Sequence, residues 1–356
     1  MSLETDVPDA LVEIPVHRGP ISGIVVSADG SRLLVTNYGD DSVAVIDTET
    51  CRVLEVVAQV TEPFAIAMGP DRAYVSTVSN AYDSIEVIDA ATNTVVATHP
   101  LALSVSDLTV SSDGKYVYAG QNGVWRADIA VLDTTTNRID VIDVAETAGT
   151  TIECVRLSPD GGRLYVGTNG PAGGRLLVIA TGAQADDGRS SWRRKKSSTR
   201  SGARRILGTV DIGSAIRDVA ISHDGVMAYV ASCGPDFGAV VDFVDTRTTK
   251  ITGTRKIAEI GGLVTQLALS GDGDRAYLVS EDRVTALCTL TQDVVGIMRA
   301  TQPSCVVESP DGAHLYIADY AGSITLTPVI SAGQSELDDP AEWTMPELLQ
   351  YEPALA

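Results

Sequence analysis

Short apolar runs alternate with polar turns along most of this chain. The first copy of the pattern contains four such runs, at residues 24–27, 33–37, 42–48 and 53–57. The first two are joined through Asp29 and Gly30. Because glycine tolerates positive φ and an aspartate side chain hydrogen-bonds its own backbone, this pair is typical of a tight hairpin turn. Each copy therefore predicts four antiparallel β-strands.

The same turn, or a close variant of it, occurs seven times. Its anchoring aspartates, at spacings of 42, 42, 47, 64, 48 and 39 residues, are Asp29, Asp71, Asp113, Asp160, Asp224, Asp272 and Asp311. A repeat of this period in strand-like sequence indicates a β-propeller, in which each repeat forms one blade. The chain is therefore predicted to be all-β, with one seven-bladed β-propeller of four-stranded antiparallel blades over residues 11–330.

The two ends of the repeat region predict how the ring closes. The last copy has no convincing fourth strand after residues 324–327, whereas residues 11–16 precede the first inner strand as 53–57 precede the second. Pro15 has no backbone N–H, which suits an outer strand better than a central one. We expect residues 11–16 to complete the seventh blade and so remove the open sheet edge.

Two sequence motifs of the repeat are similar to those of a known family. Residues 158–169 read SPDGGRLYVGTN, and residues 43–48 read VAVIDT. The repeat resembles the YVTN family of seven-bladed propellers, whose pattern is Ser-Pro-Asp-Gly-x-x-Leu-Tyr-Val-x-Asn followed by Val-x-Val-Ile-Asp-Thr. The resemblance implies the propeller fold over about residues 11–330. That family includes surface-layer proteins and lactonase-like enzymes, so the resemblance implies no single function.

Polar residues gather where the predicted inner strands begin, on the rim that also carries the loops between second and third strands. In blades three to six these are Asp107, Glu153, Arg156, Arg217, Asp218 and Gln266. Carboxylates and arginines in a solvated pocket can bind a small polar ligand or a cation. Alternatively, they form salt bridges and hydrogen bonds between blades around a water-filled channel.

A loop of blade three is the second candidate on the rim, because Trp125 is followed there by Arg126. An aromatic residue beside an arginine on a loop is typical of a contact with a partner protein. The alternative is that Trp125 caps the core of its own blade.

Motifs of common enzyme classes are absent from the sequence. It contains no Gly-x-Ser-x-Gly elbow, no His-Glu-x-x-His, no Walker A motif and no dinucleotide fingerprint. A lactonase-like activity, which the resemblance would allow, needs an acid/base pair on the rim, for which Asp107 or Asp218 with Arg217 is the candidate. The five cysteines are scattered and predict buried thiols rather than a metal or redox site. We expect no cofactor and no metal.

Charge is unevenly distributed along the chain. The net charge of −21 opposes binding of nucleic acid and anionic membrane. Residues 186–205 reverse the sign, with eight basic residues against two acidic ones, and are predicted to form a disordered insert in blade four. Nucleic acid is not expected as a partner except through this insert. Residues 331–356 form an acidic tail in which Asp339 and Pro340 predict the start of a short helix.

These features together predict a monomeric, cytoplasmic binding protein. The sequence contains no run of about 18 apolar residues, so no membrane span is predicted. The first ten residues lack the apolar core of a secretory signal. We expect a non-enzymatic scaffold that binds a protein partner or a small polar ligand on its rim. The alternative is a cytoplasmic hydrolase resembling the propeller lactonases.

Overall fold

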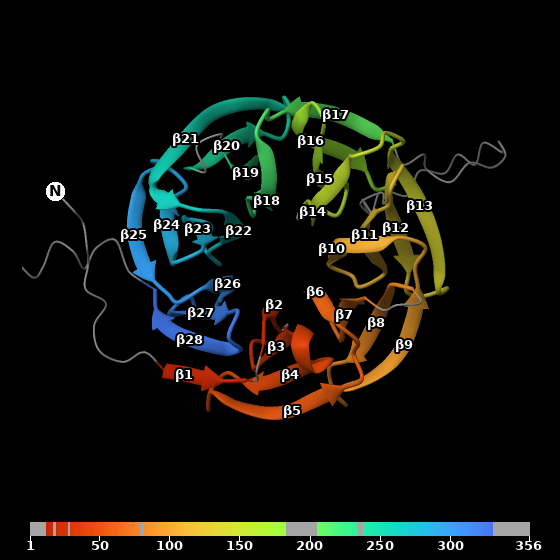
Figure 1. The fold of residues 1–356 in the computed structure, drawn as a ribbon, viewed down its shortest axis with the longest axis vertical. Coiled ribbons are helices and arrows are strands. Elements are labelled where there is room, and N and C mark those ends of the chain that lie inside the picture. Colours follow the sequence, from red (N-terminus) through yellow and green to blue (C-terminus); the bar gives the residue numbers. More distant parts are fainter. Residues whose placement is uncertain are drawn as a thin grey trace, which may run out of the picture.

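Seven four-stranded antiparallel sheets stand in a ring in this protein (Figure 1), and their innermost strands line a central channel. The structure is a computed structural model that describes residues 12–16, 19–27, 29–78, 82–182, 205–233 and 238–329. The predicted all-β, seven-bladed propeller of four-stranded blades is confirmed. The acidic tail and the basic insert, apart from Arg205, lie outside the described residues.

The strands of each blade run outward from the channel in chain order, except that the outermost strand of the seventh blade comes from the N-terminus. The first strands of the blades, which lie nearest the channel, are β2 (Ile21–Val26), β6 (Pro63–Met68), β10 (Ser104–Val110), β14 (Thr151–Leu157), β18 (Ala215–Ile221), β22 (Val264–Leu269) and β26 (Pro303–Glu308). The second strands are β3 (Arg32–Asn37), β7 (Arg72–Thr77), β11 (Tyr116–Asn122), β15 (Arg163–Gly170), β19 (Met227–Cys233), β23 (Arg275–Ser280) and β27 (His314–Asp319).

The remaining strands form the outer half of each blade. The third strands are β4 (Ser42–Asp47), β8 (Ser84–Asp89), β12 (Ala127–Asp133), β16 (Gly173–Ala180), β20 (Gly238–Asp245), β24 (Arg283–Cys288) and β28 (Ser323–Pro328). The outermost strands are β5 (Arg52–Ala58), β9 (Thr94–Pro100), β13 (Arg138–Ala145), β17 (Ile206–Asp211), β21 (Lys250–Gly261), β25 (Val294–Arg299) and β1 (Val12–Pro15). One short 3₁₀ turn, η1 (Tyr38–Asp40), joins β3 to β4.

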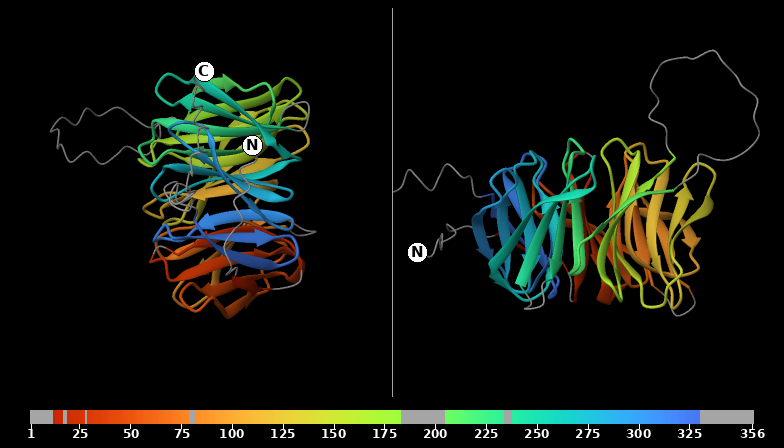
Figure 2. Two further views of the ribbon diagram at one scale, coloured as in Figure 1. Left: turned by 90° about the vertical axis from the view of Figure 1, so that its left-hand side faces the viewer. Right: turned by 90° about the horizontal axis from the view of Figure 1, so that it is seen from above.

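The hydrophobic core lies between the blades rather than within a single layer. Seven clusters of buried apolar side chains are present, and each joins two neighbouring blades. The two middle strands of a blade are therefore covered on both faces, and β4 has five buried residues in succession. The outer strand β5 is exposed at most positions because nothing packs against its outer side. Stacked blades give a short cylinder when the ring is seen from the side (Figure 2).

Closure of the ring follows the sequence prediction. Strand β1 pairs antiparallel with β28, with Val12 opposite Leu326 and Pro15 opposite Ser323. Ile14 is 2% exposed and packs in the core cluster shared by blades seven and one. Strand β1 is the outer edge of its sheet, so Pro15 costs no ladder hydrogen bond on its free side. The N-terminal strand therefore completes the seventh blade.

A serine two residues before the anchoring aspartate stabilises six of the seven hairpin turns. In the first blade Ser27 donates a hydrogen bond of 2.6 Å to Asp29, whose carboxylate also accepts the Ser31 backbone N–H at 3.1 Å. These bonds lower the pKa of Asp29 to about 2. Blade two has Gly69 in the serine position and a shorter turn. Among the described residues, no helix has the length and apolar character needed to cross a membrane.

Candidate functional site

A β-bulge at the start of every inner strand shapes the mouth of the channel. In each blade one extra residue of the inner strand lies opposite the second strand, as between Val105 and Asp107 in blade three. A bulge re-aims side chains, so two consecutive residues turn toward the channel instead of alternating. The first residues of these pairs are Ser22, Phe64, Ser106, Glu153, Arg217, Thr265 and Ser304. The second are Gly23, Ala65, Asp107, Cys154, Asp218, Gln266 and Cys305.

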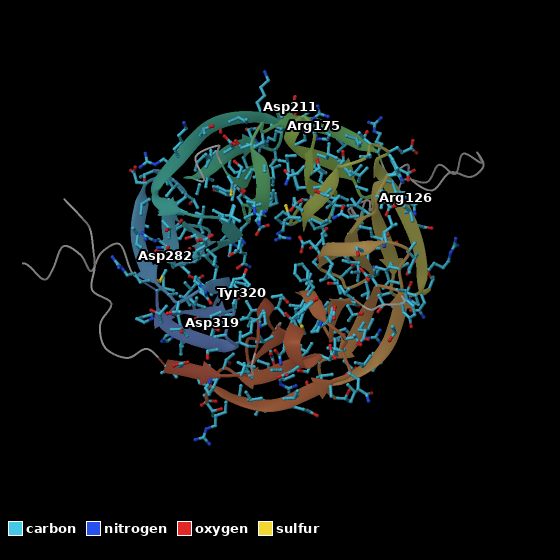
Figure 3. The ribbon with its side chains drawn as sticks, viewed as in Figure 1. Arg126, Arg175, Asp211, Asp282, Asp319 and Tyr320 are labelled. Carbon is cyan, nitrogen blue, oxygen red and sulfur yellow. The ribbon has the colours of Figure 1, made fainter. Side chains whose placement is uncertain are left out.

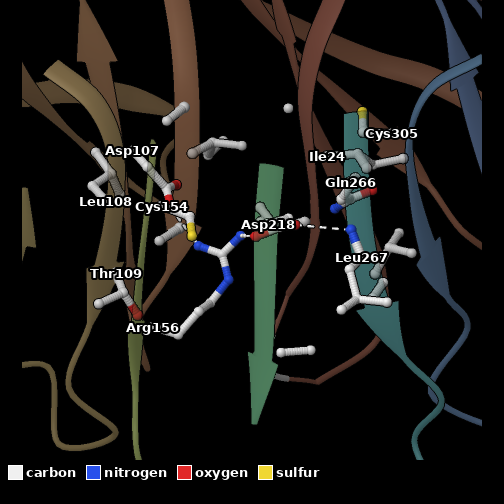
Figure 4. Close-up of a pocket in the computed structure, with 18 of the residues that line it drawn as sticks. Ile24, Asp107, Leu108, Thr109, Cys154, Arg156, Asp218, Gln266, Leu267 and Cys305 are labelled. Carbon is white, nitrogen blue, oxygen red and sulfur yellow. Dashed lines mark hydrogen bonds and ion pairs between the residues drawn. The ribbon is translucent and has the colours of Figure 1, made fainter. Parts of the chain in front are cut away.

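The channel has a volume of about 780 Å³ and brings together six of the predicted site residues. These are Asp107, Glu153, Arg156, Arg217, Asp218 and Gln266. Arg156 lies at the centre of the group, with its guanidinium between two carboxylates (Figure 4). One of its nitrogens forms a short ion pair with Asp107, and the other contacts Asp218 at 2.7 Å. The three residues thereby connect blades three, four and five.

The carboxylates and the glutamine also accept backbone hydrogen bonds from the next blade. Asp107 accepts the Val155 N–H at 2.8 Å. Asp218 accepts the N–H of Leu267 at 2.9 Å, and Gln266 accepts that of Val306 at 2.6 Å. Backbone N–H groups near the channel are thus satisfied across blade boundaries, where no strand ladder reaches them. Of the two interpretations of the sequence, bonding between blades describes Asp107, Asp218 and Gln266.

Burial controls the ionisation of this group. Burial raises the pKa of Asp218 above its usual range, although the positive charge of Arg156 opposes the rise. Burial also works against the charged form of Arg156, but the carboxylates of Asp107 and Asp218 raise its pKa above the ordinary value. The pKa of the Cys154 thiol is raised, chiefly by burial. The arginine therefore stays charged, and the thiol beside it stays protonated and unreactive.

Arg217 and Glu153 have fewer partners than the residues around Arg156. Arg217 donates from Nε to the Val264 carbonyl at 3.1 Å. Glu153 accepts the Thr151 hydroxyl at 2.7 Å. Both are bulge residues on the rim side of the channel and are partly exposed. Their charged groups are consequently available to a molecule that approaches the mouth.

The other predicted pair, Trp125 and Arg126, lies on the same rim but outside the channel. Trp125 is 73% exposed, so it does not cap the core of its own blade. Arg126 forms an ion pair of 3.3 Å with Asp128 at the start of β12. The loop between β11 and β12, where Figure 3 labels Arg126, therefore presents an exposed aromatic side chain on the rim.

Sequence reasoning missed an apolar concavity beside the mouth. It has a volume of about 530 Å³ and is lined by Pro20, Ser22, Tyr38, Phe64, Val78, Val105, Ser106 and Tyr320. Three aromatic residues in its wall, Tyr38, Phe64 and Tyr320, are each more than a third exposed. They belong to blades one, two and seven, and Tyr320 lies on the channel side of blade seven (Figure 3). Tyr38 and Tyr320 stand at the same position of the repeat, nine residues after Asp29 and Asp311, whereas Phe64 lies in the inner strand β6, so this shared spacing alone does not mark the concavity.

A second missed feature is a pair of asparagine side chains, each of which forms two hydrogen bonds with one residue of the next blade. Asn122 donates to the Ile152 carbonyl at 2.9 Å and accepts the N–H of the same residue at 2.7 Å. Asn169 contacts Ile216 in the same way, at 2.9 and 2.8 Å. Both asparagines lie at or next to the end of a second strand, nine residues after the anchoring aspartates Asp113 and Asp160. This shared distance from the turn was the available signal.

The described residues contain no cluster of three or more histidine, cysteine or acidic side chains able to hold a metal ion. Arg156 occupies the position between Asp107 and Asp218 that a cation would need. The carboxylates of the channel are thus compensated by an internal positive charge.

Comparison with known proteins identifies close relatives. No protein-family model matches the chain. The seven-bladed beta-propeller protein Rv1057 of Mycobacterium tuberculosis is 61% identical over 366 residues, which cover 98% of this chain and 93% of the relative. A seven-bladed beta-propeller protein of Mycolicibacterium smegmatis is 39% identical over 166 residues, which cover 47% of this chain and 45% of that protein. Among solved structures, hydrazine synthase of Kuenenia stuttgartiensis superimposes with a TM-score of 0.73 at 21% identity, over 89% of this chain and 97% of that one. This last likeness concerns the fold alone.

Proposed function

This chain belongs to the family of seven-bladed β-propeller proteins, and we propose that it is a non-catalytic scaffold that binds a protein partner on the rim at the channel mouth. The observation that carries the proposal is the apolar concavity lined by Tyr38, Phe64 and Tyr320. Exposed aromatic side chains around a concavity are typical of the anchor sites of protein interfaces. The exposed Trp125 extends the apolar surface along the same rim.

The channel residues support binding over catalysis. A general acid or base needs a carboxylate that is free to exchange a proton with a substrate. Asp107 and Asp218 instead hold Arg156 and backbone N–H groups of neighbouring blades. A lactonase-like hydrolysis at these residues would have to break contacts that join the blades. We therefore favour the scaffold over the hydrolase, and a protein partner over a small polar ligand.

Other properties belong to the same proposal. The repeat motifs at residues 43–48 and 158–169 support membership of the YVTN group of propellers. A cytoplasmic location is part of the same proposal. Nucleic acid is proposed as a partner only of the basic insert, because the acidic body repels it.

Affinity purification with matched variants tests the proposal. Phe64→Glu places a charge in the concavity, and Leu54→Glu places the same charge on the outer strand β5, where Leu54 is 54% exposed. We expect a protein to co-purify with the wild type and with Leu54→Glu, but not with Phe64→Glu. Retention by Phe64→Glu contradicts the proposed rim site. Turnover of sugar lactones by the purified wild type supports the hydrolase instead.

A further inference from the structure

We propose that the channel mouth recognises a polypeptide segment in which a carboxylate lies next to an apolar side chain. Arg217 pairs with the carboxylate, and the concavity walled by Phe64 and Tyr320 takes the apolar group. This inference rests on the proposed rim function and specifies the chemistry of the partner.

The guanidinium of Arg217 has donor capacity to spare. An arginine carries five N–H donors, and Arg217 uses Nε for the Val264 carbonyl. In the part of the chain that the structure describes, no carboxylate lies within ion-pair distance of Arg217, whereas Arg156 has two such partners. Its positive charge at the mouth can therefore attract a carboxylate locally, against the net charge of −21. The planar guanidinium binds a carboxylate or a phosphate through two parallel hydrogen bonds.

Tyr320 connects this positive charge to the apolar concavity. Burial raises the pKa of Tyr320, and the nearby positive charge of Arg217 opposes that rise, so the two side chains lie within electrostatic reach. Tyr320 also lines the concavity, together with Phe64. Ser22, Phe64 and Ser106 line both the concavity and the channel, which makes the two spaces continuous at the mouth. A carboxylate on Arg217 and an apolar group beside Phe64 can therefore come from neighbouring residues of one segment.

The extent of the apolar surface favours a polypeptide over a free small acid. Trp125 and Leu263 are exposed on the same rim at 73% and 39%, beyond the concavity. A small acid covers only the mouth, whereas a polypeptide reaches these side chains too. The acidic body also slows the approach of a free anion, and contacts between apolar surfaces offset that repulsion only for a larger partner.

Short capped peptides test the inference on the full chain. The probes are Gly-Phe-Asp-Gly and Gly-Asp-Phe-Gly, each with a twin in which Asn replaces Asp, titrated while the amide NMR signals of the protein are followed. The variants are Arg217→Gln, which keeps an N–H for the Val264 carbonyl, and Arg247→Gln, which removes the same charge from the turn between β20 and β21 at the opposite end of blade five. Phenylacetate serves as the free small acid.

We expect at least one acidic peptide to bind about fivefold more tightly than its Asn twin, since a partly exposed ion pair contributes a factor of this order. The preference should disappear in Arg217→Gln, persist in Arg247→Gln and weaken in ~0.5 M NaCl. Equal binding of the twins, or an unchanged preference in Arg217→Gln, contradicts the inference. So does the absence of any binding up to ~10 mM peptide, and tighter binding of phenylacetate than of the peptides assigns the mouth to small acids.

The outcome also separates this inference from the function on which it rests. Twins that bind equally, and lose binding together in Phe64→Glu, leave the rim site intact and remove only the role of Arg217. Co-purification of a partner that is insensitive to Phe64→Glu removes both.

Discussion

A cysteine in blade six occupies a turn position that aspartate fills in other blades. At the end of the third strand, Asp47 accepts the N–H of Thr50 at 2.7 Å, and Asp245 accepts that of Thr248 at the same distance. In blade six Cys288 accepts the Thr291 N–H at 3.5 Å. This hydrogen bond is the main reason why the pKa of the Cys288 thiol is lowered. The turn therefore favours an anionic acceptor even where the sequence supplies a thiol.

We expect Cys288→Asp to stabilise the protein. A carboxylate accepts the turn N–H groups more strongly than a thiol does, so the melting temperature should rise by about 1–2 °C. The reciprocal change Asp47→Cys in blade one should lower it by a similar amount. Thermal unfolding followed by circular dichroism measures both. A fall in melting temperature for Cys288→Asp shows that the blade-six turn does not bind a carboxylate as the other turns do.

The buried carboxyl group of Asp128 makes stability depend on pH. Asp128 is 1% exposed, and apart from its ion pair with Arg126 neither oxygen accepts a hydrogen bond. Burial raises the pKa of Asp128 above its ordinary value of 3.8, Arg126 opposes the rise, and Asp143 adds to it. The folded state thus holds this proton more tightly than the unfolded state. Stability contributed by the protonated form is complete below the unfolded pKa and is lost as pH rises through the raised folded pKa.

Asp128→Asn should remove this loss. The variant should melt at a higher temperature than the wild type near pH 7, by about 2 °C per kcal/mol recovered, and the gap should close toward pH 4. The control Asp211→Asn alters a carboxyl group whose side chain is 79% exposed, and should have little effect at either pH. Melting curves from pH 4 to 8 supply the comparison. A pH-independent difference between Asp128→Asn and the wild type rules out this titration as its source.

At the scale of strands and blades, polar side chains of the channel join neighbouring blades through hydrogen bonds and ion pairs. Asp218 accepts hydrogen bonds from Arg156, from the Val219 N–H and from the Leu267 N–H. Asp218→Ala leaves these three donors without their acceptor and leaves Arg156 undercompensated. We expect a loss of about 3 kcal/mol or more in unfolding free energy, measured by urea denaturation.

A graded series checks the origin of this loss. Asp218→Asn retains one acceptor oxygen and should lose less than Asp218→Ala. Gln266→Ala removes the acceptor of the Val306 N–H alone and should lose less still. Similar losses in all three variants indicate a general disturbance of the inner strands rather than the count of broken bonds.

Sequence predicted the elements of this fold well because each repeat carries its own turn chemistry. The Asp-Gly turns and apolar runs identified every blade, and residues 11–16 were assigned to the seventh blade because the last copy lacked a fourth strand. The channel group could be predicted from position in the repeat, since bulges at equivalent sites aim equivalent residues inward. The ion pairs within that group could not be predicted, because the distances between blades decide that Arg156 pairs with Asp107 and Asp218. Tyr320 of blade seven joins Phe64 of blade two in one concavity only through closure of the ring.

The N-terminal strand is expected to be essential for that closure. Deletion of residues 1–16 removes β1, exposes the edge of β28 and takes Ile14 out of its core cluster. The melting temperature should fall by several degrees, or the protein should aggregate through the free edge. Deletion of residues 1–10, which stops short of β1, is the control and should change neither property. An unchanged melting curve for a monomer lacking residues 1–16 refutes the closure argument.

For the whole molecule, charge separates the propeller body from the insert in blade four. Residues 186–205 carry +6 and the rest of the chain about −27, so the nearest strong attraction for the insert is the protein's own acidic surface. Nucleic acid is the rival partner, since Trp192 among basic residues suits a stacked base and its phosphates. Beyond the reach of the insert, a polyanion meets repulsion from the body.

Three residues that can be phosphorylated, Ser197, Ser198 and Thr199, follow a basic run in the insert, and phosphorylation would add negative charge there. We therefore expect a regulatory segment rather than a nucleic-acid site.

Removal of residues 186–205 should leave the propeller intact. The strands on either side pair directly, with Ile179 opposite Ile206, so their hairpin needs only a short connection. A long connection costs little more to close than a short one, because the closure entropy grows only with the logarithm of its length. The melting temperature of the deletion variant should therefore lie within about 1 °C of the wild type. Neither protein should bind DNA or RNA with sub-micromolar affinity at physiological salt. Salt-sensitive binding at that level, present in the full chain and absent from the deletion variant, would overturn this account and make the insert a nucleic-acid site on an otherwise repulsive body.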